Sequence, residues 1–273
     1  MKKRTLIQKL IGAPYIVWAA IFIVVPLIIV VYYSFTDADG NFTFNNIRQL
    51  RDYAEIFGIS IEYSLIATII TLVIAYPFAY VMSRKSEYSQ RIMMMLVMLP
   101  MWMNLLIRTY SWMNILERNG IINNFLALFG IEPLKMIGTP GAVIFGMVYN
   151  YIPYMILPIY TVMSKIDKSI LEAAEDLGSN SLSKLRRIIL PLSVPGVISG
   201  VTMVFVPSVS TFYISQKLGG GKIMLIGDAI ERQMQTSYNY NLGAAISLVL
   251  MIMILISLAI MNKFADNDGS LIV

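Results

Sequence analysis

The residues that most often carry covalent chemistry or hold metal ions are largely absent from this chain. Its 273 residues include no cysteine and no histidine, which excludes thiol and imidazole nucleophiles, zinc fingers, disulfides and haem bound through histidine. Methionine thioethers can bind copper, but we interpret the 19 methionines as adaptable filler between helices. We therefore predict no catalytic group, cofactor or metal ion in this chain.

The chemistry that remains is recognition of a cation by aromatic rings. Aromatic faces attract ammonium groups at about 0.5–2 kcal/mol each, which is weak enough for a bound cation to leave again. Two acids at helical i, i+3 spacing add negative charge. The candidate cation-pathway residues are Tyr76, Trp102, Asn104, Tyr110, Trp112, Phe212, Tyr213, Asp228 and Glu231. For Trp112 and Tyr213 the alternative is a place at the membrane interface, where Trp and Tyr are enriched for other reasons.

These residues lie in a chain that is too apolar for a soluble domain. Hydrophobic residues make up 57% and charged residues 14%, against about 25% charged residues in an ordinary soluble domain. A helix that crosses a bilayer needs about 20 mostly apolar residues. Six segments qualify, the third interrupted by Asn104 and Arg108: residues 11–35, 63–82, 92–115, 142–163, 190–214 and 242–261. We predict an all-α membrane protein with six transmembrane helices.

The basic residues predict the orientation of these helices. They concentrate in the N-terminus, the 83–91 loop, the 164–189 segment and the tail, which the positive-inside rule places in the cytoplasm together with both termini. The net charge of +5 is then a sign of orientation and not of nucleic-acid binding. The basic start resembles a secretory signal, but the apolar stretch that follows is too long for one, so we predict a retained first span. Arg108, inside a span, is expected to pair with an acid or with backbone carbonyls.

Proline and glycine residues inside the spans predict irregular or closely packed helices. Proline breaks the helical hydrogen-bond ladder, which fits a transporter better than an inert anchor, although simple kinks in a bundle are the alternative. The sequence from Gly196 to Gly200 is a GxxxG pattern that permits close helix packing. The prolines within predicted spans are Pro26, Pro77, Pro100, Pro153, Pro158 and Pro207.

The segment from 164 to 191 is the longest predicted cytoplasmic piece, and its pattern is typical of helix, turn and helix. Ser169 and Glu172 have the spacing of a capping box. Gly178 is placed to end the first helix in a left-handed conformation. Two short helices around a sharp turn form a knob that fits a groove on a partner. The alternative is a solvated loop that only joins two spans.

The spacing within this segment matches a known motif in full. The matching residues are Glu172, Ala173, Ala174, Gly178, Ile188, Leu190 and Pro191. This pattern resembles the EAA motif of the membrane subunits of ABC importers. The resemblance implies a type I ABC importer transmembrane-domain fold, in which residues 164–190 form a coupling loop that docks in a separate ATP-hydrolysing subunit. It also implies a single membrane domain over 1–273, with the first span and an outer loop in 1–60 and a five-helix core in 61–262.

The chain has no ATP-binding loop of its own. Its only Gly-Lys pair, Gly221-Lys222, is followed by Ile223 instead of Ser or Thr, and Gln216 stands where a Walker A loop requires glycine. ATP and magnesium must therefore bind to a partner. We predict a subunit that is not an enzyme.

Three further stretches resemble the first permease subunit of bacterial spermidine/putrescine importers: residues 75–80, 99–110 and 212–228. Trp112 departs from the pattern, because relatives are expected to have a smaller or aliphatic residue there. The resemblance implies a polyamine cargo and four protein or lipid partners: an ATP-binding subunit, a second related permease subunit, an extracellular substrate-binding protein and membrane lipid. The alternatives are an ABC permease for another small solute, a secondary transporter or channel, which would need intramembrane acids, and a membrane enzyme.

Overall fold

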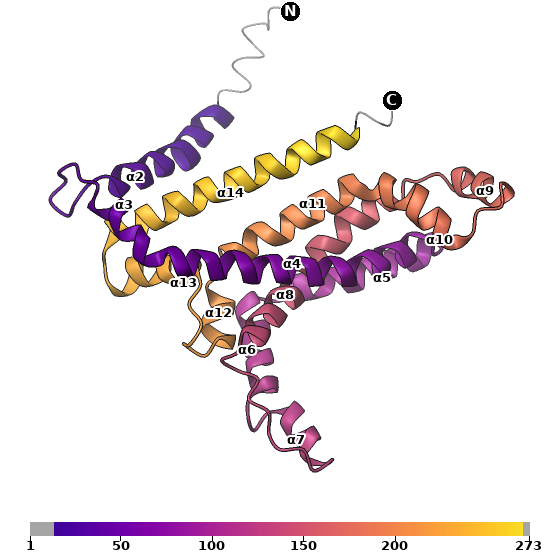
Figure 1. Ribbon diagram of the computed structural model, residues 1–273, viewed down its shortest axis with the longest axis horizontal. Helices are drawn as coiled ribbons and strands as arrows, with labels where there is room; N and C mark the ends of the chain where they lie inside the picture. The colour runs from indigo at the N-terminus through magenta and orange to yellow at the C-terminus, as the bar shows by residue number, and fades with distance from the viewer. Residues whose placement is uncertain (1–13, 270–273) are drawn as a thin grey trace, which may run out of the picture. The chain divides into compact units, whose positions relative to one another are not determined.

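The computed structural model describes residues 14–269, and these are almost entirely helical (Figure 1). The basic N-terminal residues and the start of the first predicted span lie outside the described residues. Contacts divide the described chain into two units, one formed by residues 14–54 and 229–252, the other by 55–228 and 253–269. We describe each unit by itself, and the single domain expected from the sequence stays a prediction.

The helices follow one another along the chain with short connections. A π-helical turn, Ala20–Val24, precedes α2, and a 3-10 turn, Leu50–Tyr53, precedes α4. The helices from α2 to α14 are α2 (Val25–Ser34), α3 (Asn45–Gln49), α4 (Ala54–Ser83), α5 (Glu87–Trp102), α6 (Leu105–Leu116), α7 (Ile121–Ala127), α8 (Pro140–Met163), α9 (Lys168–Asp176), α10 (Ser181–Lys184), α11 (Leu190–Val209), α12 (Tyr213–Leu218), α13 (Ile226–Glu231) and α14 (Tyr240–Gly269).

Five helical segments of the described chain are long and apolar enough to cross a membrane: Pro14–Ser34, Asn45–Ser83, Pro140–Met163, Ser181–Val209 and Tyr240–Met261. They correspond to five of the six predicted spans. The third prediction corresponds instead to the pair Glu87–Trp102 and Leu105–Ala127, which is bent by 89°. Asn104 causes the restart, because its side chain accepts a hydrogen bond from the Leu106 N–H at 2.7 Å and caps α6.

The fifth predicted span ends earlier than the sequence indicated. We expected it to continue to Ile214, but α11 ends at Val209 and the next residues form the separate helix α12. Gly227 packs against this end of α11, since a Cβ atom there would lie 2.5 Å from the Thr211 carbonyl oxygen. At the break between α11 and α12 the chain thus meets a segment that is distant in the sequence. Hydropathy carries no information about such a contact.

In the smaller unit, two asparagine side chains hold the turn that follows the first span. The Asn46 amide donates to the Ser34 and Thr36 carbonyl oxygens at 3.2 and 2.8 Å. The Asn241 amide donates to the same Thr36 oxygen at 2.7 Å. Gln233 also donates to the Tyr53 hydroxyl at 2.9 Å. The bonds from the two asparagines satisfy carbonyl groups at and just after the end of α2 that lack helical partners.

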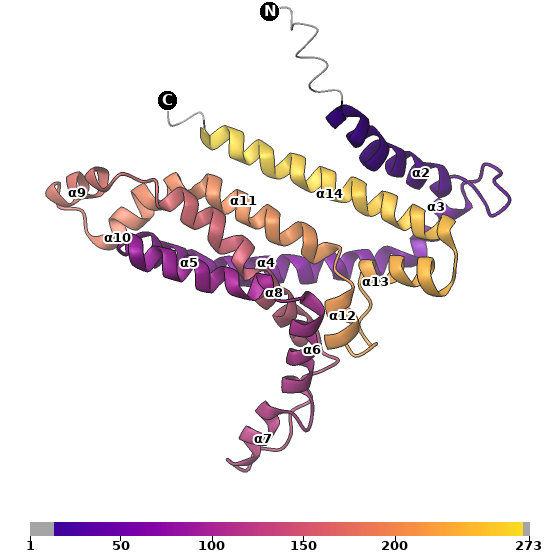
Figure 2. The ribbon, with the colours of Figure 1, turned by 180° about the vertical axis from the view of Figure 1, so that it is seen from behind.

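The larger unit is built around the packing of α8 against α11, which run side by side in Figures 1 and 2. Gly196 and Gly200 make this close approach possible. A Cβ atom at Gly196 would lie 2.9 Å from the Pro158 carbonyl oxygen, and one at Gly200 would lie 2.7 Å from the Met155 sulfur. The interface predicted from the GxxxG pattern is therefore confirmed, as a contact within the chain.

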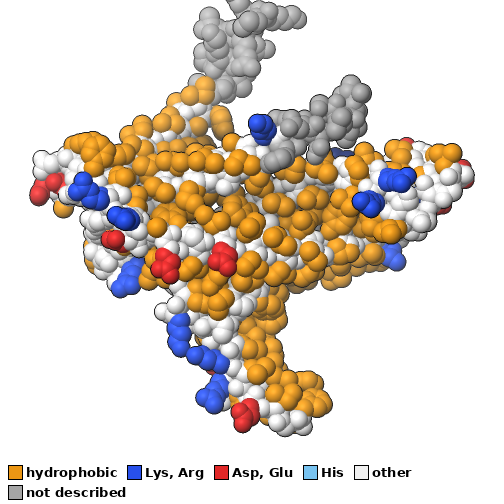
Figure 3. Space-filling view, viewed as in Figure 1, with side chains coloured by type: hydrophobic (Ala, Val, Ile, Leu, Met, Phe, Trp, Pro, Cys, Tyr) orange, Lys and Arg blue, Asp and Glu red, His pale blue; other side chains and the backbone are white. Residues whose placement is uncertain are grey.

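Two clusters of buried side chains fill the larger unit. One joins α4, α8 and α11 through residues such as Ala79, Met155 and Ile159. The other joins α6, α8 and α12 through residues such as Met147 and Ile214. In the view of Figure 3 the long helices are largely apolar, whereas Lys and Arg side chains lie toward the end that carries α9 and α10 and along the projecting arm that carries α6 and α7. This distribution is that of a helical unit with its long helices in lipid.

The glycine contacts predict an order of stability among three alanine variants. We expect Gly196→Ala to lower the free energy of unfolding by about 1–3 kcal/mol, because the clash is with backbone atoms. Gly200→Ala should cost less, since the Met155 thioether can move. The midpoint of thermal unfolding of the purified chain in detergent measures both effects.

Gly58→Ala is the matched control, because this helical glycine has open space around its Cβ position. We expect it to be neutral or stabilising by about 0.5–1 kcal/mol. Equal losses at Gly196 and Gly58 would contradict the packing argument.

Candidate functional site

The first helix of the predicted coupling loop begins at an aspartate. Asp167 has an extended backbone, and its carboxylate accepts a hydrogen bond from the Ser169 N–H at 3.0 Å. Bonds from the Ser169 backbone and hydroxyl lower the pKa of Asp167, so the charged cap persists at neutral pH. The capping box predicted at Ser169 and Glu172 is wrong, because Asp167 takes the cap position and leaves Ser169 inside α9.

The end of α9 explains why the motif places glycine four residues after its second alanine. Gly178 has φ +79°, a left-handed conformation that glycine adopts without a steric penalty. This turn directs the Ser179 N–H to the Ala174 carbonyl oxygen at 2.9 Å and the Gly178 N–H to the Glu175 carbonyl oxygen at 2.8 Å. The two bonds form a Schellman motif, and the predicted left-handed helix end is confirmed.

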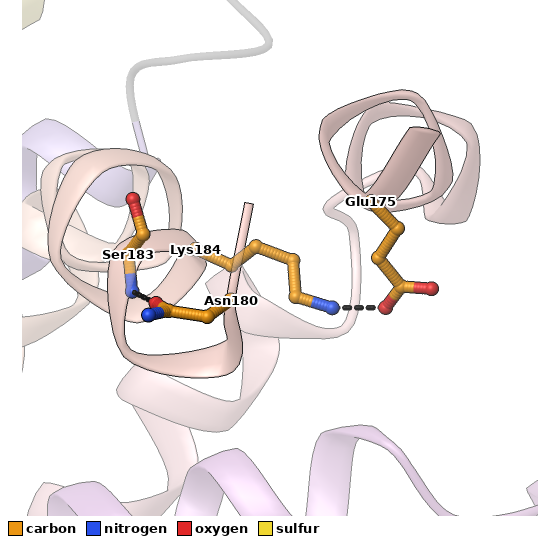
Figure 4. A network of polar contacts seen from close by, with 4 residues as sticks. All are labelled: Glu175, Asn180, Ser183 and Lys184. Atoms are coloured by element: carbon orange, nitrogen blue, oxygen red, sulfur yellow. Dashed lines mark hydrogen bonds and ion pairs between the residues drawn. The ribbon is translucent and has the colours of Figure 1, made fainter. Parts of the chain in front are cut away.

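One ion pair joins the two short helices across this turn, and one cap begins the second helix (Figure 4). The Lys184 ammonium group contacts the Glu175 carboxylate. The Asn180 side chain accepts a hydrogen bond from the Ser183 N–H at 2.8 Å and so starts α10. The knob is therefore held by its own contacts, as the helix, turn and helix pattern predicted.

The second half of the motif lies where the chain enters α11. Residues Leu185–Ile189 form a π-helical turn. Pro191 follows in the first turn of α11, where a missing N–H costs little. Ile188 is half-buried and Leu190 is 45% exposed, while their neighbour Ile189, outside the motif, is 1% exposed and anchors the turn in the core.

The knob has an anchored face and a free face. Ala174 is buried and Leu171 packs against the core. On the other side Glu172 and Ala173 are exposed, and within the described part of the chain no hydrogen-bond or ion-pair partner of the Glu172 carboxylate is found. Leu177 and Leu182, with exposed fractions of 86% and 72%, add apolar surface. This face therefore offers both a carboxylate and apolar side chains to a partner.

Two of the predicted pathway residues lie together and hold a lysine that the sequence argument missed. The Tyr110 and Tyr213 rings meet edge to face, with centroids 6.2 Å apart. The Lys217 nitrogen lies 5.0 Å from the Tyr110 centroid and 5.7 Å from the Tyr213 centroid. A hydrogen bond to the Tyr110 hydroxyl raises the pKa of Lys217. The cation on this aromatic pair is therefore the chain's own ammonium group.

The other predicted aromatic residues do not lie together. Trp102 and Phe212 are exposed, at 73% and 42%. Trp112 packs edge to face against Phe145 and Tyr149, with centroid distances of 4.6 and 5.1 Å. The half-buried Trp112 ring therefore takes part in an aromatic cluster within the chain.

Three of the four polar candidates make structural hydrogen bonds. Tyr76 shares a 2.9 Å hydrogen bond with the Ser193 hydroxyl, which links α4 to α11. Asn104 caps α6. Asp228 is buried and accepts a hydrogen bond from the Leu225 N–H at 2.8 Å, and Glu231, in the last turn of α13, is half-buried.

Arg108 does not show the pairing that we predicted. It is only 8% exposed, and its Nε and Nη1 atoms have no hydrogen-bond partner among the described residues. The residues described also contain no group of three His, Cys, Asp or Glu side chains that could hold a metal ion.

Comparison with known proteins decides the family. Residues 75–266 match the family described as the binding-protein-dependent transport system inner membrane component. The chain belongs to this family. It is therefore a multi-pass inner-membrane permease of an ABC importer, and not an enzyme, as predicted.

Similar proteins support this assignment over most of the chain. The permease is 39% identical over 242 residues to the spermidine/putrescine transport system permease protein PotB of Haemophilus influenzae, with 85% of each chain covered. It is 37% identical over 226 residues to PotB of Escherichia coli, with 79% of this chain and 82% of that protein covered. The importer permease fold is confirmed by the crystal structure of a bacterial ABC transporter involved in the import of the polysaccharide alginate, with a TM-score of 0.78 at 17% identity over 97% of this chain and 96% of that one.

Sequence reasoning missed contacts that cross between distant helices. The Tyr160 hydroxyl donates to the Gln90 side chain at 2.8 Å, and the Ile226 N–H donates to the Ser60 hydroxyl at 2.8 Å. Neither carries a local signal. Lys217 did carry one, because it follows Tyr213 by four residues and so shares a helical face with it.

The left-handed turn predicts different effects for two substitutions at one position. Gly178→Val should strain the backbone by about 1–3 kcal/mol, whereas Gly178→Asn should be tolerated, because asparagine enters this conformation more readily. Hydrogen exchange of the amides of residues 177–179 should rise about tenfold in the valine variant. Unchanged exchange in α8 controls for global unfolding, and equal exchange in both variants would contradict the Schellman assignment.

Proposed function

We propose that the α9–α10 knob couples this permease to a separate ATPase subunit. The observation that carries the proposal is the exposed Glu172 carboxylate on a knob that is anchored from behind. A free carboxylate accepts charge-assisted hydrogen bonds from a partner, while Ala173 permits close approach. Ile188, Leu190 and Pro191 then link the knob to α11, so that a displacement of the knob is transmitted to a membrane helix.

The orientation follows from this role. ATP is available in the cytoplasm, so the knob faces that side, and the basic residues of the 164–189 segment agree with the positive-inside rule. Six spans then place both termini in the cytoplasm. Docking of the ATPase on this knob therefore also tests the orientation.

The proposed cargo is a polyamine, spermidine or putrescine, carried along a path that a second related permease subunit completes. The identity of 39% over 85% of both chains to a spermidine/putrescine permease supports this cargo. The exposed rings of Trp102, Tyr110 and Phe212 supply faces for ammonium groups. An extracellular substrate-binding protein would deliver the cargo, as the family description implies.

Charge reversal at the knob tests the coupling. We expect Glu172→Lys to reduce ATP-dependent uptake at least tenfold, because hydrogen bonds to a charged group contribute about 1.5–3 kcal/mol. Co-purification of the ATPase with the permease separates failed docking from failed coupling.

Asp176→Lys is the matched control, since it makes the same charge change on the same helix outside the motif and at another exposed position. Normal uptake by the Glu172→Lys variant would refute the coupling role. Equal loss in both variants would indicate a general effect of charge on the loop.

The cargo is tested with the complete transporter in proteoliposomes. We expect a spermidine-loaded binding protein from the same system to stimulate ATP hydrolysis and to drive spermidine uptake, since cargo delivery triggers the cycle. The unloaded binding protein is the control. Stimulation by a sugar- or phosphate-loaded binding protein, without stimulation by the spermidine-loaded one, would refute the polyamine assignment.

A further inference from the structure

The aromatic pair formed by Tyr110 and Tyr213 lies on the surface of the larger unit. Tyr110 is 43% exposed and Tyr213 is partly exposed, and the neighbouring Phe212 is 42% exposed. The helices that carry them, α6 and α12, lie side by side in Figures 1 and 2. A cation that reached this surface would find two ring faces within reach of one ammonium group.

Lys217 already occupies this position. Its nitrogen lies within about 6 Å of both ring centroids, the range in which cation–π attraction is effective. Residues four apart on a helix are neighbours, so α12 holds Lys217 directly beside the ring of Tyr213.

The lysine side chain is a chemical copy of one end of a diamine. It consists of an ammonium group on a flexible four-carbon stem, which is the 1,4-diaminobutane molecule without its second ammonium group. A cargo ammonium group on the same rings would make the contacts that Lys217 makes now. The two groups cannot share the position, because like charges repel.

We propose that Lys217 is a tethered competitor of the cargo, which occupies the Tyr110–Tyr213 pair until an incoming polyamine displaces it. This inference rests on the proposed polyamine cargo. It adds a selectivity mechanism to that function, since the ring pair is closed by a group that only a suitable cation replaces.

Because Lys217 is attached to the chain, the number of ammonium groups on the cargo decides whether the cargo displaces it from the rings. A tethered group competes at an effective concentration in the millimolar range. A monoamine gains at the rings only the binding free energy that Lys217 loses there. Below the effective concentration of the tethered ammonium group, the monoamine therefore leaves Lys217 in place. A diamine or polyamine has further ammonium groups that bind elsewhere along the path, which shifts the exchange in its favour. We therefore expect discrimination between polyamines and monoamines of equal stem length.

Chemical labelling of Lys217 measures its displacement in the unmodified protein. The complete transporter in nanodiscs, with its binding protein, is treated briefly with acetic anhydride, and the acetylation of Lys217 is compared with that of Lys85 by mass spectrometry. The exposed Lys85 corrects for reagent that free amines consume. We expect the Lys217 to Lys85 ratio to rise about two- to tenfold with spermidine or putrescine and to stay unchanged with butylamine at the same concentration.

A matched pair of variants tests the same competition through function. Lys217→Met should lower the spermidine concentration that half-maximally stimulates ATP hydrolysis by about two- to tenfold, which corresponds to one cation–π contact. Lys222→Met removes an equal charge from the same region without touching the rings and should cause no shift. Lys217→Arg restores a cation on the rings and should return the wild-type value.

The outcomes separate this inference from the cargo assignment. An unchanged labelling ratio while spermidine stimulates ATP hydrolysis would overturn the displacement and leave the cargo intact. Equal shifts in Lys217→Met and Lys222→Met would also overturn it, in favour of general repulsion. Absence of any spermidine response in the wild-type transporter would overturn the cargo, and the competition with it.

Discussion

Hydrogen bonding of the backbone in lipid is the constraint on which the rest of this structure depends. Hydrocarbon offers no partner to an exposed N–H or C=O group, so spanning segments are helical and each interruption needs a replacement partner. The structure supplies such partners where helices stop. The Asn104 side chain caps the restart after the 89° bend, and the Ser60 hydroxyl accepts the Ile226 N–H at the start of α13. Polar residues inside the apolar helices thus have a structural task before any functional one.

The constraint also explains why the charged and polar contacts of this permease concentrate outside its long apolar helices. At the α9–α10 knob, charged and polar side chains cap and join the short helices. Helices of this length are marginal by themselves, so the Asp167 cap, the Schellman turn and the Glu175–Lys184 pair are needed to give the knob one shape. These contacts involve neither the Glu172 nor the Ala173 side chain, and both residues are exposed. The spacing of the motif is therefore compatible with the turn at Gly178 and with the docking face that we propose.

The proposed recognition of a cation rests on aromatic faces and on competition with Lys217, and less on acidic residues. Asp228 is buried and contributes to a local turn, while Lys217 occupies the ring pair. A deep acidic site would hold a polycation too firmly for transport, whereas ring faces of about 0.5–2 kcal/mol permit exchange. The large ring of Trp112, which departs from the expected pattern, belongs to an internal aromatic cluster and so contributes to packing.

Local and periodic features were readable from the sequence, and contacts between distant segments were not. Hydropathy predicted the apolar spans, because lipid requires about 20 apolar residues whatever the fold. The glycine spacing predicted both the left-handed turn at Gly178 and the close packing at Gly196, since glycine adopts the first conformation without a steric penalty and has no Cβ atom to obstruct the second. The cap of α9 was predicted at Ser169, but Asp167, two residues earlier, takes that position. The end of α11, the surroundings of Arg108 and the contact of Lys217 with Tyr110 were decided by the tertiary structure alone, because each depends on residues that folding brings together from separate helices.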